Sequence, residues 1–403
     1  MKHIISKSCA DAQAYIVPFR AGSHRGVSIT PEIDAAVDLA INGSFGGNLG
    51  ETYAMTLPVG DKLTSIILLG LGADKLSERD IHTKAAPAFK QAKQLGAKHV
   101  AVMLDQLSEL SESAELFGAL ARLPQLVGYT NSGLKSNPEN KNFEQVAFVT
   151  AADSLDAALR EAVATARGTI IARRLCNLRS NEQTPQSLAE DAAALGKEYG
   201  FDVQLFDKAA IEELGMESFL SVARGAHNTP PVLIVMRYLN GGDSPRIGLV
   251  GKGIVYDSGG YSIKTTPGMK NMFDDMGGAA AVIGAMTAVA DQKLKANVIG
   301  VIAACENKIA ADAYVPGDII GSMSGKTIEV ISADAEGRLT LADAVTYIQR
   351  KESCRFVADI ATLTGSAKTA VGKYSAAVLT NNEELYASAR EASRLSAEKI
   401  WRL

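Results

Sequence analysis

Short apolar runs that end near glycine alternate with helix-like stretches in the first part of the chain. Residues Ser65 to Gly72 have the length and composition of a buried strand, and a second such run covers His99 to Leu104. Between them, Ser77 to Leu95 has a helical pattern. Strands that alternate with helices build βαβ units around a mostly parallel sheet. The alternation therefore predicts an α/β fold.

The same alternation continues in the second half of the chain. Apolar runs predict five strands, at residues 231–238, 246–250, 298–303, 327–331 and 356–360. Two longer stretches predict helices at residues 277–290 and 337–350. We therefore expect a second α/β domain, built on a mixed, mostly parallel sheet that helices flank.

A chain of 403 residues is long enough for two domains. An alanine-rich stretch from Leu155 to Leu175 predicts a continuous helix between them, and Thr184-Pro185 predicts the start of the next helix. The expected organisation is an N-terminal α/β domain at 1–155, a connecting helix and turn at 156–180, and a C-terminal domain at 181–403.

Composition excludes several classes of protein. The formal net charge is −4, so no large positive field is available to attract nucleic acid. The longest apolar runs, such as Ala279 to Ala290, are too short to span a bilayer, and no apolar core follows Met1 to mark a secretory signal. The cysteines are scattered and form no CxxC pair: Cys9, Cys176, Cys305 and Cys354. Reduced thiols and a cytoplasmic location are therefore expected, without a membrane partner.

Charged side chains gather in two segments of the second domain. Residues 249–275 are predicted to run from a strand into a glycine-rich loop, and residues 331–338 run from a strand to a helix. Among the charged residues of these segments, four carboxylates and three cationic groups are the candidate site residues: Lys252, Asp257, Lys264, Asp275, Asp334, Glu336 and Arg338. Ligands bind at the carboxyl ends of strands in α/β sheets, and carboxylates favour helix N-termini. Two divalent metals with oxygen ligands account for this many carboxylates better than lysines alone.

The supply of histidine restricts what kind of site this is. The chain has five histidines, and only His227 lies in the second domain. The other four, His3, His24, His82 and His99, lie in the first. A HExxH site and a three-histidine zinc site are therefore excluded, the shortage of histidine also disfavours a serine–histidine–aspartate triad, and His227 is interpreted as a loop residue. Cys305 is interpreted as structural, and Tyr256 stands where a dinucleotide-binding loop needs glycine.

These segments resemble the leucine aminopeptidase (cytosol aminopeptidase) family. The resemblance covers most of the second domain, with its strongest motifs at residues 250–281, 305–307, 316–318, 322–330, 334–343 and 359–365. The first domain resembles the family's N-terminal domain only loosely. The resemblance implies a metal-dependent aminopeptidase that removes leucine and other N-terminal residues from peptides. It also implies a hydroxide that bridges two divalent metals, Mn or Zn.

The resemblance further implies a role for each residue of the cluster. Asp257 and Glu336 would bridge the two metals, Lys252 and Asp275 would complete one metal site, and Asp334 would complete the other. Lys252 would bind as a neutral amine. Lys264 would stabilise the tetrahedral oxyanion, and Arg338 would hold a bicarbonate ion that acts as general base. Four further residues would shape the substrate site: Met272, Thr362, Leu363 and Gly365.

Several expectations follow from comparing this chain with the family's pattern. A homohexamer is implied. Ser332-Ala333 replaces the usual Asn-Thr before Asp334, which is expected to remove hydrogen bonds near the metals, and Phe273 replaces a basic residue. Family members continue for several tens of residues past Leu403, so we expect a chain that is truncated at its C-terminus.

Two other hypotheses stay open at this point: a catalytically idle structural or regulatory relative, and a dinuclear metal phosphohydrolase.

Overall fold

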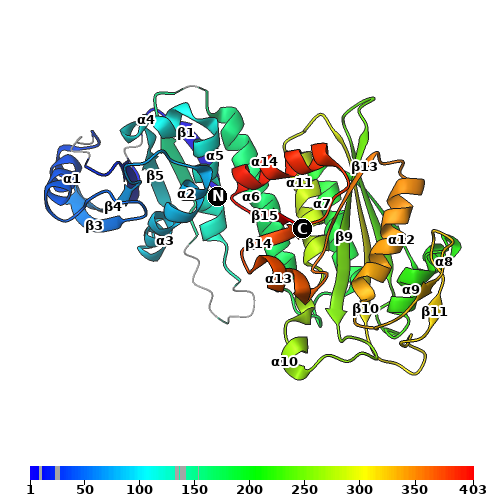
Figure 1. Ribbon diagram of the computed structural model, residues 1–403. Coiled ribbons are helices and arrows are strands. Elements are labelled where there is room, and N and C mark those ends of the chain that lie inside the picture. Colours follow the sequence, from blue (N-terminus) through cyan, green and yellow to red (C-terminus); the bar gives the residue numbers. More distant parts are fainter. Residues whose placement is uncertain (9–10, 23–27, 132–135, 137–141, 153) are drawn as a thin grey trace. The chain divides into compact units, whose positions relative to one another are not determined.

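The computed structural model describes residues 1–8, 11–22, 28–131, 136, 142–152 and 154–403 (Figure 1). Cys9 and His24 lie outside the described residues. The chain forms two compact units, one of Met1–Ala166 with Gly365–Leu403 and the other of Arg167–Thr364. The helix expected at 155–175 is α6 (Asp156–Asn177), whose residues belong partly to each unit. No helix within the described ranges has the length and apolarity that a membrane span requires.

The first unit is built on a six-stranded sheet with the order β1-β6-β5-β2-β4-β3. Neighbouring strands pair in parallel except the edge strand β3, which runs antiparallel to β4. The strands are β1 (Lys2–Ser6), β2 (Ala14–Phe19), β3 (Thr52–Val59), β4 (Lys62–Gly70), β5 (His99–Met103) and β6 (Gln145–Val149). The helical segments among them are α1 (Pro31–Gly43), α2 (Glu78–Lys84), α3 (Ala86–Gln94), η1 (Leu104–Gln106), α4 (Ser108–Glu112) and α5 (Ala114–Gly128).

The stretch predicted to be helical at 77–95 forms two consecutive helices, α2 and α3. Ser77 begins α2 with a capping box to Asp80, and α2 ends at Ala85. Pro87 lies in the first turn of α3 and has no backbone N–H to continue the α2 hydrogen-bond ladder. The break therefore follows from one proline within an otherwise helical pattern.

The last part of the chain clusters with the first unit. It contains α13 (Gly365–Val371), β14 (Ser375–Val378), α14 (Glu383–Ser396) and β15 (Lys399–Arg402), and β14 pairs with β15 in parallel. Arg394 of α14 forms ion pairs with Glu78 and, at 3.0 Å, with Glu115. These ion pairs join α14 to α2 and α5.

The second unit is built on a five-stranded sheet with the order β13-β9-β10-β8-β7. Strands β13, β9 and β10 run parallel, whereas β8 and β7 pair antiparallel. The strands are β7 (Asp202–Phe206), β8 (Val232–Leu239), β9 (Arg246–Asp257), β10 (Asn297–Asn307) and β13 (Phe356–Ile360). A separate two-stranded sheet joins β11 (Ile319–Ile320) to β12 (Ile328–Glu329), which is shorter than the predicted strand 327–331.

Helices cover both faces of this sheet (Figure 1). On β8, Ile234 and Met236 face one core with α7 (Pro185–Tyr199) and α11 (Gly277–Asp291), while Leu233 and Val235 face another core. That second core contains residues of α8 (Lys208–Glu213), α9 (Glu217–Ala223) and α12 (Glu336–Arg350). Such period-two alternation is what a strand buried on both faces requires. The predicted α/β fold class with a mixed, helix-flanked sheet is therefore confirmed.

Strand β9 extends further than its apolar run predicted. The predicted strand ended at Val250, but β9 continues to Asp257, so Lys252 lies within a strand and not in a glycine-rich loop. The glycines serve close packing here: a Cβ at Gly251 would lie 2.7 Å from the Ala279 Cα atom of α11. Strand β10 likewise extends to Asn307. The extra length carries both strands into the region of charged side chains.

Gly278→Ala is expected to destabilise the second unit. A Cβ at Gly278 would lie 1.9 Å from the Ile360 carbonyl oxygen, so the first turn of α11 would move away from the sheet. Overpacking of this kind lowers the free energy of unfolding by about 1–3 kcal/mol. Gly118→Ala is the control, because Gly118 lies inside α5 with open space around its Cα. Urea unfolding should show a loss for Gly278→Ala alone, and equal losses would contradict the packing argument.

Candidate metal centre

Charged residues meet where the parallel strands of the second unit end. Asp257 is the last residue of β9, and its register partner on β10 is Asn307. Asp275 lies between η2 (Met272–Asp274) and α11, and Glu336 is the first residue of α12. Both acidic residues therefore lie at helix N-termini, as the pattern predicted. The site forms at the carboxyl edge of the sheet, the usual ligand site in such folds.

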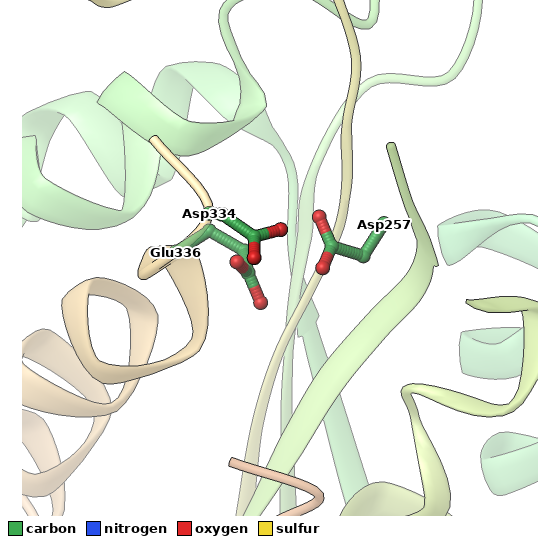
Figure 2. A group of neighbouring side chains, drawn as sticks. All are labelled: Asp257, Asp334 and Glu336. Atoms are coloured by element: carbon green, nitrogen blue, oxygen red, sulfur yellow. The ribbon is translucent and has the colours of Figure 1, made fainter. Parts of the chain in front are cut away.

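Three carboxylates form the centre of the site. Asp257, Asp334 and Glu336 each offer an oxygen atom, and these atoms all lie within 4.8 Å of one another. Figure 2 shows the three side chains, with Asp257 facing Asp334 and Glu336 from the opposite side. Asp257 and Glu336 are each 2% exposed, so two of the three are removed from water. Like charges this close favour a cation among them.

Lys252 extends the group toward Asp275. Its Nζ lies 2.6 Å from Asp275 Oδ2 and 2.8 Å from Glu336 Oε1, and it donates to the Thr362 carbonyl oxygen at 3.2 Å. Lys252 as a whole is 2% exposed. Burial acts to lower the pKa of Lys252, but the Glu336 and Asp275 carboxylates outweigh burial and raise it. In the absence of a metal, Lys252 is therefore a cation that holds two carboxylates together.

Lys264 holds the other two carboxylates. Its Nζ lies 2.8 Å from Asp257 Oδ2 and 2.5 Å from Asp334 Oδ1. Burial acts to lower its pKa, and the hydrogen bonds to Asp257 and Asp334 outweigh that effect and raise it. Lys264 is more accessible than Lys252, with 18% of its side chain exposed against 3%. Lys264 is thus the cation that solvent or a ligand can reach.

The two lysines do not neutralise the four carboxylates that they contact. Burial raises the pKa of Asp275 and of Glu336, although Lys252 acts against this rise in both. Within the described residues, Glu336 Oε2 is a buried oxygen without a hydrogen-bond partner. An oxygen-rich, negatively charged site with an unpaired buried oxygen fits a divalent cation.

The other predicted site residues stand in different surroundings. Thr362 contacts an acidic residue of the site, because its hydroxyl donates to Asp275 Oδ1 at 2.8 Å. Arg338 lies on α12 with its side chain exposed, and no ion pair to it occurs in the described part of the chain. Met272 begins η2 and is half-buried, and Leu363 is 38% exposed. Gly365 begins α13 and belongs to the first unit.

The residues interpreted as structural have ordinary surroundings. His227 is an exposed loop residue whose Nε2 lies 3.0 Å from Asp312 Oδ1. Burial raises the pKa of the Cys305 thiol well above its usual value, which is unfavourable for a nucleophile. Asp343 is fully buried and accepts hydrogen bonds from two backbone N–H groups, those of Phe219 and Met323. Both oxygens of the Asp343 carboxylate are thus used to bind backbone N–H groups of two other segments.

Sequence reasoning assigned no role to two residues that hold the acidic side chains in place. Asn307 Nδ2 donates to Asp257 Oδ1 at 2.8 Å and to the Ala333 carbonyl oxygen at 3.0 Å. Tyr314 also donates to the Ala333 carbonyl, at 2.7 Å. Asn307 comes four residues after the predicted strand 298–303, near the strand end where ligands gather in α/β sheets, and this position is the signal that could have identified it.

The fold and the site together define a class, an α/β protein with an oxygen-ligand centre for divalent cations. Comparison with known families makes the class specific. Residues 170–403 match the catalytic domain of the cytosol aminopeptidase family, and residues 34–138 match that family's N-terminal domain. The chain belongs to the cytosol aminopeptidase family. The predicted family is therefore confirmed, and membership supports a metal-dependent peptidase.

Individual relatives agree with this membership. A probable cytosol aminopeptidase of Clostridium perfringens is 41% identical over 99% of this chain and 83% of its own length. Another, of Fusobacterium nucleatum, is 41% identical over 89% of this chain and 73% of its own. Among solved structures, a mutant of tomato leucine aminopeptidase matches with a TM-score of 0.86 and 29% identity. That match covers 100% of this chain and 82% of the tomato chain.

Proposed function

We propose that the chain is an aminopeptidase with a dinuclear metal centre, which hydrolyses the N-terminal residue, leucine among others, from peptides. Family membership supports the reaction class. The observation that carries the metal centre is the group of three carboxylate oxygens within 4.8 Å of one another. Asp275 and Lys252 adjoin this group through Glu336, so enough donors are present for two cations.

The donor set divides between the two proposed metals. Asp257 and Glu336 would serve both, Lys252 and Asp275 would complete one site, and Asp334 would complete the other. When bound, the pair of cations supplies Lewis acidity to the scissile carbonyl and lowers the pKa of a water molecule. Oxygen ligands suit Mn²⁺, and Zn²⁺ accepts carboxylates as well as the lysine nitrogen. We therefore propose Mn or Zn.

Lys264 would act on the substrate. Its ammonium, the more accessible of the two, would turn from Asp257 and Asp334 once cations neutralise them, and would stabilise the developing oxyanion. Arg338 offers an exposed guanidinium, to which a bicarbonate ion could bind and act as general base. No histidine is required in either role.

The substrate's free amine would bind at the metals, which limits cleavage to the N-terminal residue. Met272, Leu363 and Gly365 are proposed to shape the site for the first side chain. Thr362 is proposed to contribute through its position beside Asp275, to which its hydroxyl is bonded. A homohexamer remains a prediction from the family resemblance, and a cytoplasmic location remains a prediction from the scattered cysteines.

The proposal predicts a strict requirement for metal and for a free amine. The chain treated with chelator should not hydrolyse leucine p-nitroanilide, and adding Mn²⁺, Zn²⁺ or Co²⁺ should restore release of p-nitroaniline. N-acetyl-leucine p-nitroanilide is the matched control substrate and should not be hydrolysed, since its blocked nitrogen is no longer an amine. Absorbance of p-nitroaniline measures both rates.

Other outcomes would identify a different protein. Turnover of an aryl phosphate without turnover of leucine p-nitroanilide would indicate a phosphohydrolase. A folded chain that binds Mn²⁺ but hydrolyses neither substrate would be a catalytically idle relative. Equal hydrolysis of the free and acetylated anilides would contradict the proposed role of the substrate amine.

A further inference from the structure

Asn307 connects two of the acidic segments through one amide group. Its side chain is fully buried, and its Nδ2 donates to both Asp257 Oδ1 and the Ala333 carbonyl oxygen. Ala333 immediately precedes Asp334 in the chain. The amide therefore ties the end of β9 to the segment that carries Asp334 and Glu336.

A β-bulge brings Asn307 into this position. On β10, Cys305 pairs with Ile254 of β9, whereas Glu306 pairs with Tyr256, so β9 contains one extra residue at this point. Without the shift, Asn307 would stand opposite Tyr256, but with the shift it stands opposite Asp257. Bulges next to functional sites often re-aim a side chain in this way.

The orientation of the amide is fixed by its partners. Both partners are acceptors, so the NH₂ group must face them and the oxygen must face away. In the described part of the chain, Asn307 Oδ1 is buried without a hydrogen-bond partner, and a Cβ at Gly260 would lie 2.9 Å from it. A buried unpaired acceptor is unfavourable, so the two donated bonds are kept at a cost to stability.

The Ala333 backbone is held on both of its polar groups. Its carbonyl accepts from Tyr314 as well as from Asn307, and its N–H donates to Ser262 Oγ at 3.0 Å. None of these bonds uses the side chain at position 333. Alanine at this position therefore leaves these backbone hydrogen bonds in place, although it lacks the hydroxyl of the family's usual threonine.

We propose that Asn307 is a positioning residue that sets the distance between Asp257 and the Asp334–Glu336 pair, and that metal affinity depends on it. This inference rests on the metal centre proposed above. Three carboxylates repel one another before a cation arrives, and a buried cross-link between their segments opposes that repulsion. Removing one such supporting hydrogen bond typically weakens metal affinity by about 10- to 100-fold.

The test is calorimetric titration of the chelator-treated chain with Mn²⁺. Asn307→Ala should raise the dissociation constant about 10- to 100-fold. Tyr314→Phe keeps the shape of the ring and removes one of two donors to the Ala333 carbonyl, so it should raise the constant less, by about 10-fold or under. Saturating Mn²⁺ should restore kcat of Asn307→Ala on leucine p-nitroanilide, because every proposed ligand is still present.

Asn297→Ala is the matched control, at the opposite end of the same strand. Asn297 is also buried, and its Nδ2 donates to the carbonyl oxygens of Gly242 at 2.9 Å and Ser244 at 2.8 Å. The Asn297→Ala variant should lose thermal stability and keep its affinity for Mn²⁺. Unchanged affinity in both folded Asn307→Ala and Tyr314→Phe would overturn the inference. If Asp257→Asn also left affinity unchanged, the proposed metal centre itself would be wrong.

Discussion

Asp257→Asn is expected to lower kcat/KM on leucine p-nitroanilide by about 10³-fold or more, because metal catalysis contributes several kcal/mol and each 1.36 kcal/mol is about tenfold. Asp257 is a proposed ligand, and both of its carboxylate oxygens are already oriented. Oδ1 accepts from Gly259 N and Asn307 Nδ2, each at 2.8 Å, and Oδ2 lies 2.8 Å from Lys264 Nζ. An amide has the same shape but no charge, so the same titration should show weak or absent Mn²⁺ binding.

Asp343→Asn separates this effect from a loss of folding. Asp343 is as buried as Asp257, and its two oxygens accept from Phe219 N at 3.0 Å and Met323 N at 2.8 Å. An amide nitrogen cannot accept one of these bonds, so Asp343→Asn should lose stability and retain Mn²⁺ affinity. If both variants lost activity in proportion to their loss of stability alone, Asp257 would have no special role as a ligand.

The fold was predictable from pattern where apolar runs were long, and less so at strand ends. Strand β13 and helix α11 were predicted to within a residue or two, because each coincides with a mainly apolar run of the length expected for a strand or a helix. The end of β9 was missed, because Gly251, Lys252 and Gly253 have low strand propensity, and tertiary packing against α11 decides their conformation.

The site was predictable from charge, but its supporting contacts were not. Several carboxylates at the expected ends of strands and starts of helices indicated a cation site before any coordinates, and the family resemblance supplied individual roles. Which lysine contacts which carboxylate depends on side-chain geometry across three loops. The position of Asn307 depends on a bulge that no local pattern marks. Residues that act through hydrogen bonds to backbone carbonyls leave little trace in composition.

Lys252 and Lys264 have the same charge but different proposed roles: one binds metal and the other acts on the substrate. Lys252 is enclosed between Asp275 and Glu336, where it would itself become a ligand. Lys264 occupies the side of the cluster that solvent reaches, between Asp257 and Asp334. A metal cation bound on this side would neutralise these carboxylates in place of Lys264. The ammonium and the proposed metal would therefore compete for the same oxygens.

Lys264→Met is accordingly expected to separate metal binding from catalysis. We expect kcat on leucine p-nitroanilide to fall about 10²- to 10³-fold, the usual effect of removing one oxyanion donor. The dissociation constant for Mn²⁺ should not rise, because the variant has lost a competing ammonium. The metal-free variant should be less stable by about 3 kcal/mol, since buried Asp257 loses its ion-pair partner, and Mn²⁺ should restore that stability. Stopped assays, calorimetry and thermal unfolding measure the three quantities.

Lys270→Met is the control, because Lys270 is an exposed lysine that follows α10 (Thr266–Met269) in the same loop region as Lys264. It should leave kcat, Mn²⁺ affinity and stability near those of the unaltered chain. A parallel loss of Mn²⁺ affinity and of kcat in Lys264→Met would mean that Lys264 supports the ligands and does not act on the substrate. Full activity in Lys264→Met would remove it from the mechanism, because the metals alone would then stabilise the oxyanion.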